Sequence, residues 1–110
     1  MRAAEFLGAR PDGDRSWLVA IGRDRHGAFG GAFGGLLSAC CVLAARSAAP
    51  QREPVSLDSR FLRAVPAGEA RFVPTVIHAG RTLTCVSVDA FDKGGRLAFR
   101  GAVSLVSPGS

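Results

Sequence analysis

A glycine-rich loop that runs directly into an apolar segment is the part of this sequence best suited to chemistry. Residues 27–35 include five glycines, and the Ala- and Leu-rich residues 36–45 that follow predict an α-helix. The first backbone N–H groups of a helix have no intrahelical acceptor, so they can stabilise a developing negative charge. At Gly34 and Gly35 no side chain would block a substrate, although the same glycines would also let the helix pack closely on a sheet.

The predicted helix is apolar on almost every side, so it must be buried by something large. Five other segments have the alternation or the β-branched content of strands, with Gly- and Pro-rich breaks between them. These strands are predicted over residues 16–23, 55–61, 70–79, 82–91 and 97–106. The order predicts an α+β domain in which a curved antiparallel sheet of about five strands wraps one long central helix.

Length and composition predict one globular domain over residues 1–110, with an N-terminal extension at 1–15 and a tail at 107–110. The chain is 47% hydrophobic and 21% charged, and its formal net charge of +5 comes from its arginines. These are scattered, without a basic run or interleaved aromatic residues, which favours a phosphate-bearing small ligand over nucleic acid. The edge strands of such a sheet need protection, so we expect a dimer.

The cysteines and histidines predict neither a metal site nor a disulfide. There are three cysteines and two histidines, without a Cys-x-x-Cys pair. Cys40 and Cys41 are adjacent on the predicted helix, where their side chains diverge, so we expect buried free thiols in a reducing compartment. The N-terminus lacks the apolar segment of a signal peptide, and the predicted helix is too short to span a bilayer. We therefore expect a cytoplasmic protein without a membrane segment.

Three short motifs follow one another along the chain: Phe33-Gly34-Gly35 before the helix, Ser56-Leu57-Asp58 with Phe61-Leu62-Arg63, and Gly80-Arg81-Thr82 before a hairpin. With these motifs and the element order from Trp17 to Val106, the chain resembles the hotdog-fold acyl-CoA thioesterases, in particular one half of a type II acyl-CoA thioesterase. The resemblance implies a hotdog fold and two units side by side, with the acyl thioester between them. Because this chain holds one unit, it implies a homodimer or a pairing with a second hotdog unit.

The resemblance also implies catalytic roles for individual residues. Asp58 falls at the position of the catalytic carboxylate and would activate water, while Thr82 resembles the hydroxyl residue that orients this water. The backbone amides near Gly34 and Gly35, beside Phe33, would hold the oxyanion of the tetrahedral intermediate.

Asp58 is predicted to point away from the core of its own unit. Alternation places it on the face opposite Val55, Leu57 and Phe61, where it could face a partner. Desolvation there would make the carboxylate a better base near neutral pH. The alternative is an exposed aspartate paired with a neighbouring arginine, either Arg60 or Arg63.

Arginine forms bidentate contacts to phosphate, so Arg63, Arg81 and Arg100 are candidates to meet the phosphates of coenzyme A, which enters as part of the substrate, with no separate cofactor. The alternative for each is a solvated surface charge. The chain departs from the family on the last strand, where Val103 stands at about the position of a glutamine, and Ser104 would substitute for it only in a different register. No acidic residue lies on the predicted helix, which disfavours the mechanism of those hotdog thioesterases that use one.

We therefore expect hydrolysis of an acyl-CoA or acyl-carrier thioester by a hotdog dimer. Two alternatives stay open. One is a catalytically inactive hotdog subunit that completes a dimer or binds an acyl thioester, which the missing glutamine favours. The other is a dehydratase or cyclase that acts on a biosynthetic acyl thioester.

Overall fold

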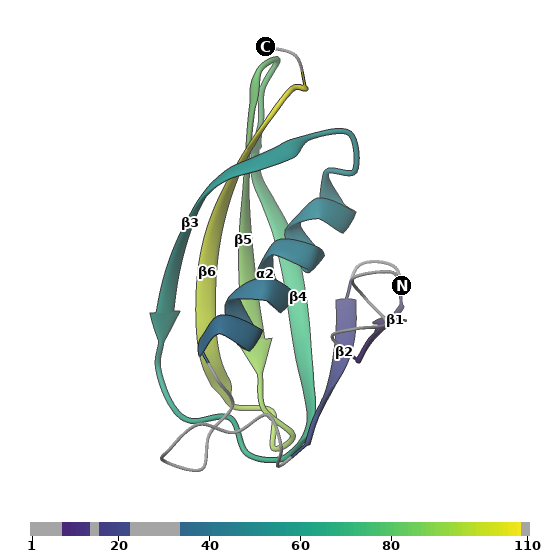
Figure 1. The fold of residues 1–110 in the computed structure, drawn as a ribbon, viewed down its shortest axis with the longest axis vertical. Helices are drawn as coiled ribbons and strands as arrows, with labels where there is room; N and C mark the ends of the chain where they lie inside the picture. Colours follow the sequence, from purple (N-terminus) through teal and green to yellow (C-terminus); the bar gives the residue numbers. More distant parts are fainter. Residues whose placement is uncertain (1–7, 14–15, 23–33, 109–110) are drawn as a thin grey trace.

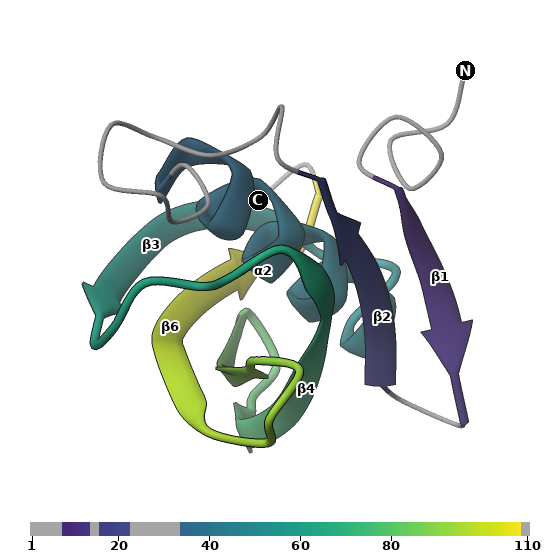
Figure 2. The same cartoon turned by 90° about the horizontal axis from the view of Figure 1, so that it is seen from below.

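The computed structural model describes residues 8–13, 16–22 and 34–108. These ranges contain β1 (Ala9–Asp12), β2 (Ser16–Ile21), α2 (Gly34–Ala48), β3 (Glu53–Phe61), β4 (Gly68–Ala79), β5 (Leu83–Phe91) and β6 (Leu97–Val106). The strands form one antiparallel sheet in the order β1-β2-β4-β5-β6-β3, which curves around α2 (Figures 1 and 2). This confirms the predicted α+β architecture of one long helix against a curved antiparallel sheet.

The strand β1 lies in the segment that was predicted as an N-terminal extension. It pairs with β2 from Ala9, opposite Val19, to Asp12, opposite Ser16. Its four residues, two of them charged and one a proline, lack the β-branched content that indicates a strand. The sheet therefore has six strands in the described ranges rather than about five.

The core lies between α2 and the inner face of the sheet. The helix contributes small and medium side chains that recur along one side, namely Leu37, Cys40, Cys41, Ala44 and Ala45. The strands contribute larger ones, among them Val19, Phe72, Val86, Val88, Phe99, Val103 and Leu105. The helix approaches β6 closely, since a Cβ at Gly101 would lie 2.4 Å from the Cys41 Sγ.

The hairpin between β5 and β6 turns at Asp92-Lys93-Gly94-Gly95, as predicted. The Asp92 Oδ1 accepts hydrogen bonds from the backbone N–H of Gly94 at 2.9 Å and of Arg96 at 3.0 Å. The turn therefore closes around a buried carboxylate.

Candidate functional site

The start of α2 is the candidate oxyanion site. Gly34 and Gly35 are its first two residues, and its first turn carries no acidic side chain that would offset the helix dipole. Among the described residues, nothing lies within 4 Å of where a Gly35 Cβ would stand. Gly34 lies beside the end of β3, since a Cβ there would be 3.1 Å from the Phe61 Cζ. Phe33, also predicted for this site, lies outside the described residues.

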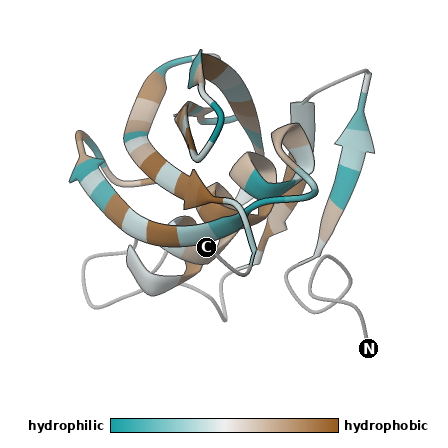
Figure 3. Cartoon of the chain, turned by 90° about the horizontal axis from the view of Figure 1, so that it is seen from above, coloured by the Kyte–Doolittle hydropathy of each residue, from teal (hydrophilic) through white to brown (hydrophobic). Residues whose placement is uncertain are grey.

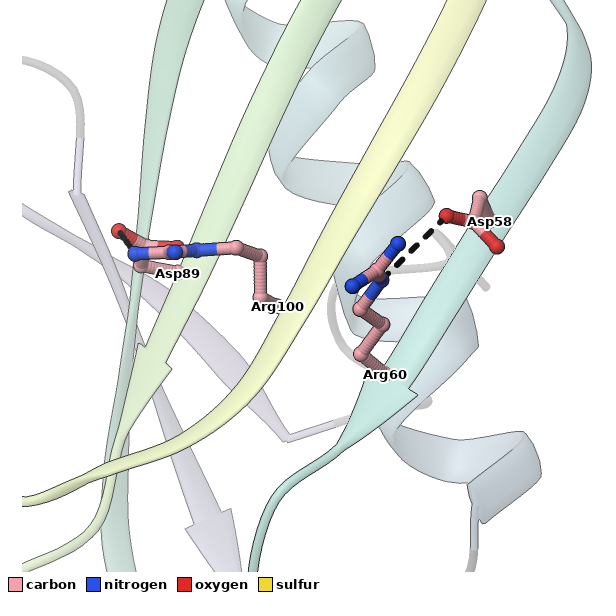
Figure 4. Close-up of polar contacts among 4 residues, drawn as sticks. All are labelled: Asp58, Arg60, Asp89 and Arg100. Atoms are coloured by element: carbon pink, nitrogen blue, oxygen red, sulfur yellow. Dashed lines mark hydrogen bonds and ion pairs between the residues drawn. The ribbon is translucent and has the colours of Figure 1, made fainter.

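Asp58 lies on the outer face of β3, which is turned away from α2. The preceding residue, Leu57, is opposite Val103 of β6, which is buried beneath the helix, so the next side chain along points outward. The Asp58 side chain is 73% exposed, and its Oδ2 lies 3.8 Å from the Arg60 Nε (Figure 4). The predicted orientation away from the core is confirmed, and the carboxylate lies beside one of the two arginines expected as alternatives.

A second ion pair lies on the same outer face (Figure 4). Arg60 is opposite Arg100 of β6, whose Nε donates to the Asp89 Oδ1 over 2.7 Å. This hydrogen bond and the Asp89 charge raise the pKa of Arg100. Arg100 is therefore already paired with a carboxylate, which leaves Arg60 as the cation nearer to Asp58.

The β6 residue opposite Asp58 is Ala102. The sequence placed the missing glutamine at about Val103, the next residue along β6. Three hydroxyls share this face near Asp58: that of Ser56, two residues before it on β3, that of Ser104, opposite Ser56 on β6, and that of Ser87, opposite Ala102 on β5. Sequence reasoning weighed Ser104 only for a different register and missed Ser87. The alternation of β5 could have placed Ser87 on the outer face. To identify it as a neighbour of Asp58, the register between the strands must also be known.

The remaining predicted residues lie near the two ends of β3. Arg63 is exposed just beyond its last residue, and Arg81 and Thr82 are exposed in the turn between β4 and β5, next to its first residue. Asp58 lies five residues further along β3, about 17 Å at the usual rise of an extended strand. A single chain therefore does not bring Thr82 and Asp58 together.

The strand β3 forms an edge of the sheet and exposes several large apolar side chains. Beyond it the described part of the chain supplies no further strand, and Figure 3 shows alternating apolar and polar bands along it. The exposed large apolar side chains here are Val55 (61%), Leu57 (37%), Phe61 (54%) and Leu62 (54%). Val55 does not share the regular inward alternation predicted for it, because a bulge interrupts the pairing between Pro54 and Ser56.

The cysteines and the described histidine add no further catalytic group to the predicted site. Cys40 and Cys41 are buried, as predicted, and the pKa of Cys41 is raised to about 12 by burial and by the neighbouring Cys40. Cys85 is only partly buried because it lies on the outer face of β5, and His78, near the end of β4, is exposed. In the described ranges, no cluster of His, Cys, Asp and Glu side chains is suited to a metal ion, and no helix is long and apolar enough to cross a membrane.

The sequence matches a known protein family and two curated relatives. The family model of the acyl-CoA thioesterase N-terminal domain matches residues 23–106. Two proteins named as uncharacterized, from Mycobacterium tuberculosis and Mycobacterium bovis, are 35% identical to the chain over 81 residues. The matches cover 68% of this chain and 28% of each relative, so the chain spans less than a third of these curated relatives.

Solved structures share the fold at low sequence identity. A Bacillus halodurans protein, crystallised with CoA, has a TM-score of 0.86 at 15% identity, covering 94% of this chain and 73% of that one. A Haemophilus influenzae thioesterase has a TM-score of 0.84 at 18% identity, covering 94% and 80%. The tesB protein of Mycobacterium avium subspecies paratuberculosis has a TM-score of 0.83 at 22% identity, covering 98% of this chain and 43% of that one. These similarities confirm the hotdog fold.

Proposed function

The chain belongs to the acyl-CoA thioesterase N-terminal domain family, and from this premise we propose that it hydrolyses acyl-CoA or acyl-carrier thioesters as one of a pair of hotdog units. The observation that carries the proposal is the exposed Asp58 carboxylate within the Ser-Leu-Asp motif, on a strand that is itself an uncovered edge. The CoA in the Bacillus halodurans structure supports an acyl thioester as the substrate class.

Hydrolysis needs an activated water, a stabilised oxyanion and a thiolate leaving group. In the proposed reaction, the Asp58 carboxylate accepts a proton from water, and the hydroxide attacks the thioester carbonyl carbon. The carbonyl oxygen becomes negative and accepts hydrogen bonds from the N–H groups of Gly34 and Gly35, at the positive end of a helix. The C–S bond then breaks, and the leaving thiolate takes the proton from Asp58, which gives a carboxylic acid and a free thiol.

The carboxylate and the amides would come from different units. Asp58 lies on the outer face of the sheet, whereas the start of α2 lies on the inner face of the same chain. In this proposal Thr82, distant from Asp58 in its own unit, orients the water from the partner. Arg63 and Arg81 are both exposed and available to the phosphates of coenzyme A. The second unit would be another copy of this chain or a separate hotdog domain.

The substitution Asp58→Asn tests the proposed base, because the amide keeps the shape of the side chain and cannot take the proton. With a panel of acyl-CoA substrates and a thiol reagent, kcat is expected to fall about 10²–10⁴-fold. The matched control is Asp12→Asn, an aspartate at the other edge of the sheet, which should leave turnover unchanged. Full activity in Asp58→Asn would refute the assignment.

A catalytically inactive unit is the second candidate, and the composition of β6 favours it. Neither Ala102, opposite Asp58, nor Val103 supplies the amide that the family carries on its last strand. In this case the chain would bind an acyl thioester, or complete a dimer, without hydrolysing it. Purified wild-type protein that binds acyl-CoA but releases no thiol above background would support this candidate over the hydrolase.

A further inference from the structure

We propose that the outer face of the sheet carries a second binding site, beside Lys93, for an amphipathic carboxylate. A cavity of about 600 Å³ lies there, lined by β2, β4, the end of β5 and the turn before β6. Its volume falls within the range of small-molecule sites, about 300–1,000 Å³. Neither Asp58 nor Gly34 lines it, so the site is separate from the proposed catalytic residues.

Three apolar side chains line the cavity. Leu18 of β2, Val73 of β4 and Phe91 of β5 all line it and are half-buried. They surround Arg71, which is opposite Leu18 on one side and Phe91 on the other and lies two residues before Val73, so the apolar stem of the arginine lies among them. These apolar side chains lie outside the main core, so an alkyl chain that covered them would favourably remove apolar surface from water.

Two of the charged residues that line the cavity are already paired with β1. The Arg71 Nε lies 3.3 Å from the Asp12 Oδ2. Glu69 forms an ion pair with Arg10. These side chains offset one another and leave no excess charge on this side of the cavity.

The other two charged residues, Asp92 and Lys93, differ in their partners. The Asp92 carboxylate is occupied by the turn, with its Oδ2 3.4 Å from the Arg96 Nε. Lys93 is the only lysine in the chain, and in the described part of the chain no carboxylate forms an ion pair with it. Its stem lies along Gly68, where a Cβ would be 2.9 Å from the Lys93 Cδ.

The site therefore combines one unpaired ammonium with three apolar side chains. A single ammonium matches a monoanion, whereas a phosphate dianion would require further cations or amide donors. The ligand class that fits is a carboxylate with an alkyl chain. This inference does not depend on hydrolysis, because binding is measured without turnover.

The single lysine makes the test direct. Reductive ¹³C-methylation labels Lys93 and the N-terminal amine, and it keeps the lysine charge. Titration with octanoate should shift the Lys93 signal saturably, and the neutral analogue octan-1-ol should bind about fivefold more weakly. Trp17, the only tryptophan, lines a different cavity, so its fluorescence should stay unchanged.

Three variants separate the charge from the apolar side chains, with binding of unlabelled protein followed by calorimetry. Lys93→Gln should weaken octanoate binding about fivefold, as expected for a solvent-exposed ion pair. Arg46→Gln removes an exposed charge elsewhere, on α2, and should have no effect. Leu18→Asp should abolish binding, and its carboxylate can be accommodated because it lies between Arg10 and Arg71. An unshifted Lys93 signal, equal affinity for octan-1-ol, or equal losses in Lys93→Gln and Arg46→Gln would each overturn the proposal.

Discussion

The two edge strands of the sheet differ in length, composition and cover. The strand β1 has four residues, and its charged side chains Arg10 and Asp12 pair with residues of β4. The strand β3 has nine residues and exposes large apolar side chains. Short length, proline and charge are common means by which a sheet edge avoids pairing with another chain. The strand β3 also contains a proline, charges and a bulge, so its greater length and its exposed apolar side chains are what make it the more available edge.

This difference indicates where a second unit would join. Asp58 lies on β3, so the uncovered edge and the proposed base belong to the same strand. A second unit that covered this edge would shield the exposed apolar side chains from water and would at the same time lie close to the Asp58 carboxylate. At the other edge, the ion pairs of β1 border the cavity beside Lys93, which suits a small ligand rather than a further strand.

A carboxylate on the free edge of β3 is expected to have the largest effect. Val55 is 61% exposed, so Val55→Asp should leave the isolated fold intact. In a dimer joined through β3, it would bury unpaired like charges at the interface. We expect the dimer dissociation constant to rise at least about 100-fold, measured by light scattering during size-exclusion chromatography.

The matched control for Val55→Asp is Pro11→Asp on β1, which also adds an exposed charge to an edge strand. Its assembly should match that of the wild type. If both variants dissociate equally, or if neither does, the two edges do not differ in the proposed way.

An intermediate effect is expected from Gly101→Ala, which changes β6, the strand that pairs with β3. The new Cβ would lie 2.4 Å from the Cys41 Sγ, so β6 or α2 must move. The free energy of unfolding should fall by about 1–3 kcal/mol in chemical denaturation. Because β6 is the neighbour of β3, amide hydrogen exchange should accelerate more in β3 than in β1.

The control for Gly101→Ala is Ala102→Ser, which changes the next residue on the exposed outer face and should leave stability unchanged. Uniform acceleration of exchange over β1 and β3 would contradict a local role of β6 in holding this edge.

The same two edges show how far the sequence could predict the fold. Alternation in β6 and apolar content in α2 are strong local signals, and both elements formed where predicted. The strand β1 carries no such signal, because its pairing depends on β2 and on ion pairs to β4. The bulge at Val55 likewise depends on how β3 meets β6, which no local pattern encodes.

The candidate site was predictable in orientation but not in assembly. Alternation alone places Asp58 on the outer face, as the structure shows. The separation of Thr82 from Asp58, and the presence of Ala102 beside Asp58, follow from register between strands distant in sequence. The residues that a partner unit would contribute to the site cannot be predicted from the alternation pattern of a single chain.

A small effect is expected from Asp12→Asn, which removes an ion pair of β1. The Arg71 and Asp12 side chains are 56% and 39% exposed, so water already screens the pair. The free energy of unfolding should fall by about 0.2–1 kcal/mol, and the difference should shrink in about 1 M salt. Assembly should not change; a monomeric Asp12→Asn protein would show that β1, and not only β3, contributes to the interface.

The smallest effect at neutral pH is expected at Asp92, in the turn that joins β6 to β5. The backbone N–H of Arg96, followed by that of Gly94 and by the Arg96 charge, holds the pKa of this carboxyl below its usual value despite burial. A lowered pKa means that the ionised carboxylate stabilises the fold above its usual pKa, about 3.9, and that this contribution is lost as pH falls through the lower folded value.

The measurement compares the thermal midpoints of the wild type and Asp92→Asn between pH 7 and pH 2. The wild type should be the more stable at pH 7, and the difference should shrink below about pH 4. Because the main cause is a backbone hydrogen bond rather than the exposed Arg96 charge, most of the difference should persist in about 1 M salt. A difference in thermal midpoint that stayed constant down to pH 2 would mean that the ionised state of Asp92 does not stabilise the turn. The stability of the β5–β6 hairpin, and of β3 beside it, would then not depend on this carboxylate's charge.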